Sequence, residues 1–240
     1  MIKDYLSIVI PCKNEENYIK RTLEEVSLQS GIRGTRVIIA DGGSTDLTIQ
    51  RISEFINSED NNLVVEIIKG GGVSFGRNRG AELVKTPFIL FLDADITFTD
   101  LSAIDDSLNK IRNGNIELIG TTPEYMGDFD LAAGIIFFLN RVTAKILSVT
   151  DPFAVGAFML ISRKRFIDIG GFDEEVHQSE DWLLSRQISP KKFKLIPNLI
   201  TQDNRRFKKF GYLRMLKMVI ANWFNRGDKK HFHKDLKYWE

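Results

Sequence analysis

The first half of the chain alternates short apolar runs with segments of helical periodicity, and this alternation restricts the fold more than any other feature. Four runs predict strands, at residues 6–11, 36–40, 63–68 and 88–95. Helices are expected between them, at residues 15–29, 44–55 and 76–84. The runs are continuously apolar, as in strands that are covered on both faces. The pattern therefore predicts an α/β fold with a mostly parallel sheet flanked by helices.

Acidic residues follow three of the predicted strands, within 11–15, 41–46 and 93–95. In such sheets ligands bind outside the carboxyl ends of the strands, so these acids are expected to meet at one edge. Close carboxylates repel one another unless a cation or hydrogen-bond donors stabilise them. Oxygen ligands suit Mg²⁺ or Mn²⁺, and Mg²⁺ commonly joins carboxylates to substrate phosphates. We therefore predict that Asp93 and Asp95 hold a metal–diphosphate; the alternative is that the pair caps a turn.

The loops at this edge lack the known glycine-rich phosphate cradles. The first predicted strand is followed by PCKNEE, and the later run GGGVSFG at residues 70–76 matches neither G-x-G-x-x-G nor a P-loop. The sequence therefore favours a mononucleotide site over a dinucleotide site.

Composition and charge suggest one domain with a basic appendage. The chain has 240 residues and a single cysteine, Cys12, which excludes an internal disulfide framework and fits a reducing compartment. Its first residues do not read as a signal peptide, so a cytoplasmic location is expected. Residues 205–240 carry eleven Lys or Arg against three acids, a net charge of +8, and the overall +1 leaves −7 on residues 1–204. Such a tail indicates an anionic partner, or else a solvated basic helix.

Five motifs, in this order, resemble those of the family 2 glycosyltransferases of the GT-A fold: SIVIPCKNEE, IIADGGSTD, GVSFGRNRGAELVKTPFILFLDAD, GAFMLISRKRFIDIGGFDE and EDWLLSR. The resemblance covers residue 6 to about residue 187. It implies a GT-A domain at 1–204, with a nucleotide-binding half at 1–99 and an acceptor-binding half at 100–204. The basic segment at 205–240 is then expected to be an extension of amphipathic helices. The implied activity is that of an inverting, metal-dependent enzyme that uses a nucleotide-sugar, with UDP-sugar favoured.

The resemblance assigns roles to residues on the nucleotide side. Pro11 and Glu15 would line the nucleoside pocket, with Glu15 near the ribose. Asp41 would accept a hydrogen bond from the base, which for uracil is its N3–H. Gly42 stands where the family often has a second acid, so base selectivity is less secure. Arg77 would reach the nucleotide.

The strand-end acids and their neighbours complete this side of the expected site. Asp93 would face the ribose and the metal, Mg²⁺ or Mn²⁺, while Asp95 would bind the metal directly. Ser44 and Asp46 are expected to cap the following helix, because an acid near a helix N-terminus is stabilising by itself.

The acceptor side is expected at the start of the EDWLLSR segment. In inverting members an acid at this place is the general base, which removes the proton of the acceptor hydroxyl as its oxygen attacks the anomeric carbon. We assign this role to Asp181, with Glu180 as the second candidate, and expect the helix dipole to keep the carboxylate ionised. The alternative is that both residues are merely acids in a first helical turn.

The segment QDNRRF at 202–207 resembles the Q-x-x-R-W segment of processive members, but Arg206 stands in place of the tryptophan. This argues against a processive polymerase. Arg205 and Arg206 could stabilise the leaving diphosphate. A further metal ligand is expected in this region, and the sequence leaves His177 and Asp203 open.

The segment at residues 131–149 is long and apolar enough to suggest a membrane span. However, Asn140, Arg141 and Lys145 lie within it, and each central cation would cost about 2.5–3.5 kcal/mol on insertion scales. On a helical wheel one stripe of apolar residues forms, made of Leu131, Ile135, Phe138, Leu139, Val142, Ile146 and Val149. Ile136, Phe137 and Leu147 lie off this stripe. A helix that buries one face therefore has apolar residues left over, which could lie against a membrane or a partner subunit.

Residues 208–226 pair aromatic with basic side chains, as an interfacial helix would. The expected partners are therefore a nucleotide-sugar donor and a sugar or lipid-linked acceptor, with peripheral contact to the cytoplasmic membrane face through 131–149 and 205–240. A fully soluble enzyme is the alternative. A homo-oligomer is left open, and no nucleic acid is expected.

Two other classes of function remain. A metal-dependent nucleotidyltransferase would also use acids and a metal, but it would normally carry a glycine-rich basic loop where PCKNEE stands. A non-catalytic module that binds sugar-nucleotides or lipids is disfavoured by Asp181 alone. The sequence names neither the sugar nor the acceptor.

Overall fold

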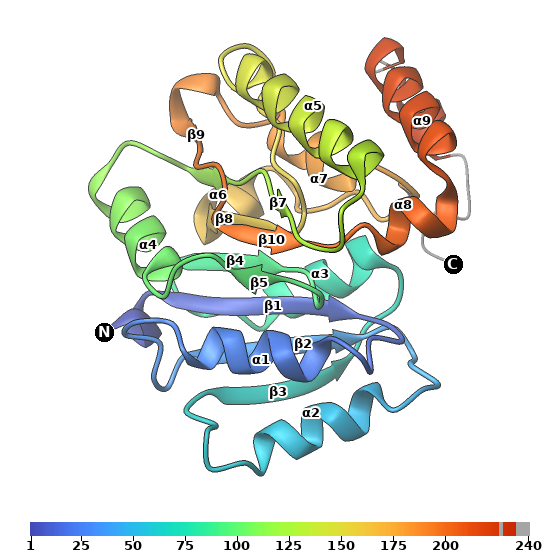
Figure 1. Ribbon diagram of the computed structural model, residues 1–240. Helices are drawn as coiled ribbons and strands as arrows, with labels where there is room; N and C mark the ends of the chain where they lie inside the picture. The colour runs from blue at the N-terminus through green and yellow to red at the C-terminus, as the bar shows by residue number, and fades with distance from the viewer. Residues whose placement is uncertain (226–227, 234–240) are drawn as a thin grey trace.

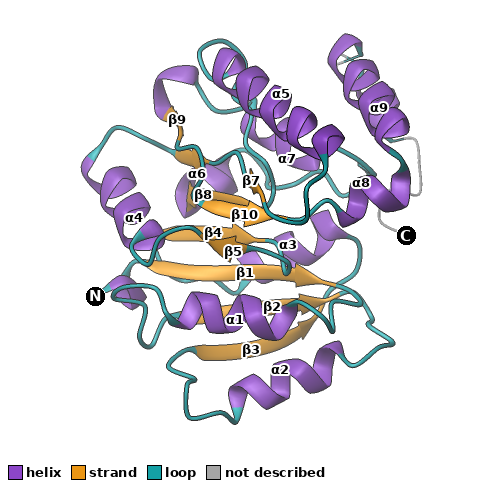
Figure 2. Cartoon of the chain, in the orientation of Figure 1, coloured by secondary structure: helices purple, strands orange, loops and turns teal. Residues whose placement is uncertain are grey.

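A seven-stranded sheet runs through the computed structural model, which describes residues 1–225 and 228–233 (Figures 1 and 2). Its strands, in the order β3-β2-β1-β4-β8-β6-β9, are β3 (Val64–Lys69), β2 (Arg36–Asp41), β1 (Leu6–Cys12), β4 (Phe88–Leu92), β8 (Phe158–Ser162), β6 (Leu118–Gly120) and β9 (Phe193–Leu195). Strands β3, β2, β1 and β4 are parallel, and β8 is antiparallel to both of its neighbours. The predicted α/β fold with a mostly parallel sheet is confirmed.

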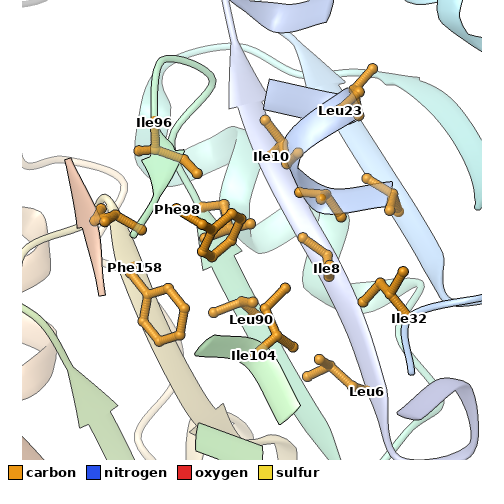
Figure 3. Packing of buried hydrophobic residues seen from close by; sticks show 14 of the residues in the cluster. Leu6, Ile8, Ile10, Leu23, Ile32, Leu90, Ile96, Phe98, Ile104 and Phe158 are labelled. Carbon is orange, nitrogen blue, oxygen red and sulfur yellow. The ribbon is translucent and has the colours of Figure 1, made fainter. Parts of the chain in front are cut away.

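Helices cover both faces of this sheet, and the burial of successive strand residues alternates between two hydrophobic clusters. Helices α1 (Ile19–Ser27), α2 (Thr48–Ile56) and α4 (Ala103–Asn113) contribute to the cluster that contains Ile8 and Ile10 of β1 (Figure 3). Val9, between those two residues, belongs to the opposite cluster, with residues of α6 (Arg163–Asp168) and α7 (Glu180–Ser185) and with Ala81 of α3 (Val73–Glu82). Burial on both faces explains why β1, β2 and β4 are continuously apolar, whereas the edge strand β3 leaves Val64 and Ile67 exposed.

A small second sheet places strand β10 beside the residues that follow β4. Strand β10 (Ile200–Gln202) pairs antiparallel with β5 (Thr97–Phe98) and parallel with β7 (Glu124–Tyr125). Ile200 lies opposite Phe98 and Thr201 opposite Thr97, so the chain leaving β10 passes the residues just after β4. This pairing brings residues 202–205 to the strand-end acids, although more than one hundred residues separate them in sequence.

Two helices begin later than predicted, because side-chain hydrogen bonds hold the residues of their first expected turns in loops. Helix α1 begins at residue 19 rather than 15, and α2 at 48 rather than 44. The side chain of Asn14, which has a positive φ of 56°, accepts a hydrogen bond from Thr45 N at 2.8 Å. Asp46 accepts one from Thr48 N, as a cap would, whereas Ser44 binds Asp41 instead. Helix α3 begins earlier than expected, at residue 73 within the glycine run.

A short 3-10 helix, η1 (Ile2–Asp4), lies at the N-terminus. The remaining helices lie in the C-terminal half, and they are α5 (Leu131–Leu147), η2 (Pro190–Lys192), α8 (Arg205–Phe210), α9 (Tyr212–Phe224) and α10 (Lys229–Phe232). Helices therefore lie in the predicted C-terminal extension, while their amphipathic character stays a prediction. None of the helices in the described ranges has the length and apolarity that a membrane crossing requires.

Helix α5 faces the protein with the side opposite to its apolar stripe. The large apolar residues are exposed; we call them the α5 stripe, and they are Leu131, Ile135, Phe138, Leu139, Val142, Ile146 and Val149. The residues of α5 that are buried are Ala133, Ala144 and Leu147. The periodicity predicts this stripe, and the structure adds that it points away from the core.

Candidate active site at the carboxyl ends of the strands

Arg77 of α3 joins the two halves of the predicted site. Its guanidinium Nη2 donates to Asp93 Oδ1 at 2.9 Å, and Nη1 donates to Glu180 Oε1 at 2.7 Å. The side chain is fully buried, which by itself would lower its pKa, but the charges of Asp93 and Glu180 outweigh burial and raise it. Arg77 thus remains a cation between the residue that follows β4 and the first residue of α7. We expected it to reach the nucleotide, and the structure places it between these two carboxylates.

Gly156 allows this buried arginine to lie against the backbone. A Cβ at this position would collide with the guanidinium of Arg77, so only glycine lets the loop before β8 pass so closely. The backbone N–H of Gly156 also donates to Asp181 Oδ2 at 2.7 Å. Sequence reasoning did not single out this residue, although it is the leading glycine of the motif GAFMLISRKRFIDIGGFDE.

Asp181 lies beside this network in a half-buried position. Its second carboxylate oxygen accepts a hydrogen bond from Trp182 N at 2.7 Å. Burial, and then the charge of Glu180, raise the pKa of Asp181 to about 7, although Arg77 and the two backbone donors act in the opposite direction. Desolvation thus acts against the expected effect of the helix dipole, in a helix of only six residues. A pKa near 7 is well suited to general base chemistry at neutral pH.

A second arginine bridges the acids on the nucleotide side. Arg205 Nη2 lies 2.6 Å from Asp95 Oδ2 and 2.7 Å from the carboxylate of Glu15. Burial would lower the pKa of Arg205, but the hydrogen bonds and charges of these two carboxylates raise it instead. The guanidinium also lies over the ring of Tyr18, 4.2 Å from the ring centre. Glu15 and Asp95, which come from different strand ends, therefore share one cation.

Two further residues of this cluster were not assigned from the sequence. The hydroxyl of Tyr18 donates to Asp203 at 3.1 Å, and the amide of Gln202 donates to Asp95 at 3.4 Å. Gln202 lies in the segment QDNRRF that the sequence marks, so a signal for it existed. Nothing in the local sequence distinguishes Tyr18 from an ordinary helix-start aromatic.

The nucleoside side is brought together by the register of β1 and β2. Pro11 lies opposite Ala40 and Cys12 opposite Asp41, so the two loops that follow these strands lie side by side. The carboxylate of Asp41 accepts hydrogen bonds from Gly43 N at 3.1 Å and from the Ser44 hydroxyl at 2.6 Å. These bonds give Asp41 a turn-forming role in addition to the predicted contact with the base, which stays a prediction.

The chemistry of the donor set at the end of β4 fits a divalent cation. Asp93 and Asp95 are both about 8% exposed, and each is paired with an arginine, as acids that need a positive charge should be. Their oxygens are the ligand type that Mg²⁺ and Mn²⁺ prefer. Of the two candidates for a further ligand, Asp203 lies in this cluster through Tyr18. No contact among the described residues links the side chain of His177 to it.

A second group of possible metal ligands lies elsewhere. Among the described residues, Asp173, Glu175 and His233 have side chains close enough to hold an ion, but both acids are exposed. Arg206 falls within α8, and its side chain lies outside the part of the chain that the structure describes. Its predicted role toward the diphosphate stays a prediction.

The comparison with known proteins agrees with this arrangement. The family model described as Glycosyl transferase family 2 matches residues 7–170, more than half of the chain, and the chain therefore belongs to this family.

Curated relatives match the chain over shorter stretches. The minor teichoic acid biosynthesis protein GgaA of Bacillus subtilis (strain 168) is 38% identical over 119 residues, which cover 47% of this chain and 27% of that protein. The teichoic acid poly(glycerol phosphate) polymerase of Staphylococcus epidermidis is 34% identical over 109 residues, which cover 45% of this chain and 15% of that protein. The chain thus spans about a quarter or less of these relatives.

Solved structures share the fold at low identity. The mannosyltransferase PcManGT from Pyrobaculum calidifontis, in complex with GDP-Man and Mn²⁺, has a TM-score of 0.67 at 16% identity, covering 89% of this chain and 64% of that one. TarS 1–349 of S. aureus, in complex with UDP-GlcNAc, has a TM-score of 0.63 at 18% identity, covering 91% and 67%. The fold is that of the GT-A glycosyltransferases.

Proposed function

We propose that this protein is an inverting glycosyltransferase that moves a sugar from a nucleotide-diphosphate sugar, with UDP-sugar favoured, to an acceptor hydroxyl. One observation carries the proposal: Arg77 holds Asp93, the strand-end acid of the donor side, and Glu180, the neighbour of the candidate base, on one guanidinium. In a single displacement, the side chains that bind the donor must lie next to those that activate the acceptor. Similar structures bound to UDP-GlcNAc and to GDP-Man with Mn²⁺ support a nucleotide-sugar donor and leave the base as part of the proposal.

In the proposed reaction, the carboxylate of Asp181 takes the proton of the acceptor hydroxyl as its oxygen bonds to the anomeric carbon. The bond from that carbon to the diphosphate oxygen breaks, and the electron pair leaves with the nucleoside diphosphate. Arg205, and Arg206 beside it in sequence, would stabilise the departing negative charge. A divalent cation held by Asp93 and Asp95, with Asp203 as the candidate for a further ligand, would neutralise the diphosphate.

Arg205 must change partners in this scheme. Its guanidinium lies within 2.7 Å of Glu15 and Asp95, the residues proposed for the ribose and the metal. Donor binding would supply new anionic oxygens for the arginine and free Asp95 for a cation. The exchange would pair Arg205 with the diphosphate and Asp95 with the cation, and it would leave Glu15 to the ribose hydroxyls.

We propose a lipid-linked or membrane-proximal acceptor, in the synthesis of a cell-envelope polymer or glycolipid. The teichoic acid proteins among the relatives support this direction. Residues 131–149 and 205–240 would contact the cytoplasmic face of the membrane, because the α5 stripe leaves large apolar side chains in solvent.

Removal of Asp95 is expected to weaken the binding of UDP in the presence of Mn²⁺ strongly. Asp95→Ala removes the carboxylate proposed to bind the metal, so isothermal titration calorimetry should show a loss of affinity of about tenfold or more. Asp173→Ala serves as the matched control, because Asp173 belongs to the exposed acidic group remote in sequence from the strand-end acids. Unchanged affinity in Asp95→Ala, or a loss in Asp173→Ala instead, would move the metal away from β4.

Turnover is expected to rise with pH around neutrality. The pKa of Asp181 is raised to about 7, and only its deprotonated form can accept the acceptor proton. At saturating substrates, turnover should therefore fall about tenfold for each pH unit below the pKa and level off above it. Initial rates between pH 5.5 and 9, taken as a buffer series, would test this. A flat profile across neutrality would contradict the assignment.

A further inference from the structure

The α5 stripe reverses the usual orientation of a helix on a protein surface. A surface helix normally buries its large apolar residues and exposes its polar face. Helix α5 buries Ala133 and Ala144 completely and leaves Phe138 64% exposed and Ile146 64% exposed. Such a contiguous apolar face marks a contact with another apolar phase.

Helix α9 shows the same orientation. Leu213, Leu216, Ile220 and Phe224 recur at helical spacing and are exposed, whereas Met215 on the other side is buried. We call these four exposed residues the α9 stripe. The hydroxyl of Tyr212, the first residue of α9, donates to Asp130, the N-cap of α5, so both helices begin at one junction. In Figure 1 they rise from that junction along the same side of the molecule.

The charged residues within the two helical segments have a single sign. Segments 131–149 and 205–224 contain eight Lys or Arg and no Asp or Glu. On α5, Arg141 and Lys145 fall on one flank of the stripe, and on α9, Arg214 and Lys217 flank the other stripe. Acids stand only beyond the ends of α5, at Asp128, Asp130 and Asp151, so the charged side chains along both helices are cations. An apolar surface flanked by cations along its length suits an anionic bilayer. A second copy of the chain would bring the same cations face to face, which disfavours a symmetric dimer through this surface.

A basic groove lies at the end of α5. Its volume is about 690 Å³, and its lining includes four cations from two segments, Arg141 and Lys145 of α5 with Lys191 and Lys194 near β9. Among the described residues, none of these four side chains makes an ion pair or a hydrogen bond. The described residues that line the groove include no acid, and Val149 belongs both to its wall and to the α5 stripe. Four uncompensated cations around one hollow form a site for a phosphate group.

We propose that the α5 and α9 stripes dock on an anionic phospholipid bilayer and that the groove of Arg141, Lys145, Lys191 and Lys194 binds a lipid phosphate. This proposal rests in part on the proposed function, because it assigns the membrane contact proposed there to a defined face of the protein. The groove adjoins the α5 stripe, so a lipid would place its phosphate headgroup in the groove and its acyl chains against the stripe at the same time. This favours a lipid headgroup over a free phosphate.

The geometry also relates this surface to the active site. Asp130, which caps α5, accepts a hydrogen bond from Asn204 at 2.7 Å, and the next residue, Arg205, binds Asp95. The docking surface therefore begins beside the candidate site and extends for about 25 Å along the 17 residues of α5. A lipid-linked acceptor in the bilayer would approach the site from this edge.

Vesicle sedimentation of the full chain without nucleotide tests the proposal. The protein should pellet with vesicles that contain phosphatidylglycerol, and less with phosphatidylcholine alone, and added salt should weaken the binding. Phe138→Ser with Ile146→Ser should lower the affinity about tenfold or more, whereas the control Leu28→Ser with Ile167→Ser, at exposed apolar sites on other helices or their ends, should not. Equal loss in both pairs, or equal binding to both vesicle types, would overturn the bilayer contact.

The groove has its own pair of variants. Lys191→Glu with Lys194→Glu should lower the affinity for anionic vesicles about tenfold or more and leave binding to neutral vesicles unchanged. Lys110→Glu, an exposed lysine on α4, is the matched control. Competition by soluble glycerol phosphate that removes vesicle binding would assign the groove to a free phosphate instead. A dimer in solution that the Phe138→Ser and Ile146→Ser substitutions dissociate would assign the stripe to a second copy.

These outcomes are separable from failure of the proposed activity. Asp181→Asn should bind vesicles as the wild type does, because Asp181 lies in neither the stripes nor the groove. An inactive protein that binds anionic vesicles would overturn the transferase alone. An active transferase that does not bind anionic vesicles would overturn the docking surface alone.

Discussion

Asp181→Asn is expected to lower turnover by roughly 10²–10⁴, the usual contribution of a general base, while donor binding is retained. The amide keeps the shape of the side chain and can still accept the N–H of Gly156 or of Trp182, but it has no basic site for the acceptor proton. Steady-state kinetics with calorimetry of the donor complex would separate turnover from binding. The residual rate should also lose the rise with pH around 7, because the titrating carboxyl is gone.

One control variant and one product analysis sharpen this test. Asp168→Asn removes an exposed acid of α6 that, among the residues the structure describes, pairs with Lys164, and it should leave the rate unchanged. Normal turnover in Asp181→Asn would move the role to Glu180 or elsewhere. NMR of the product should show the opposite anomeric configuration to the donor, because one displacement inverts the centre. A retained configuration would exclude the mechanism.

The strands and the acidic edge could be predicted because their signals are local. Each strand is an apolar run bounded by turn residues, and parallel strands place their carboxyl ends at one edge regardless of detail. The pairing of side chains across that edge could not be predicted. Arg77 and Glu180 are 103 positions apart, and Arg205 and Glu15 are 190 apart. The packing of α7 near α3 brings the first pair together, and the path of β10 along β5 brings the second.

The orientation of α5 marks another boundary of sequence reasoning. Helical periodicity locates the α5 stripe correctly, since it depends only on the 3.6-residue repeat. It does not say which side meets the protein, because that depends on what the neighbouring elements offer. Here the neighbours accept the small side chains of Ala133 and Ala144, and the large residues face outward. The pKa of Asp181 could not be predicted for a similar reason, because its cause is burial beside Glu180.

Arg77→Met is expected to destabilise the fold by about 3–5 kcal/mol. The change removes the single cation between two carboxylates, and breaking a buried ion pair from one side leaves uncompensated charge in the interior. Arg77 is 0% exposed, so water cannot easily replace the guanidinium. Urea denaturation should show a lower midpoint with an unchanged slope if the native structure is otherwise kept.

The same helix supplies the control for this prediction. Arg79→Met removes an exposed arginine that pairs with Glu82 one turn away, and the expected change is within about 0.5 kcal/mol. Adding Glu180→Gln to Arg77→Met should recover part of the lost stability, because it removes one of the two stranded carboxylates. Equal urea midpoints for Arg77→Met and Arg79→Met would mean that the ion pairs of Arg77 are solvated. Packing alone would then hold the two halves of the site together. A large loss with partial recovery would instead make Arg77 the group that aligns Asp93 with Glu180, and through Glu180 with the candidate base beside it.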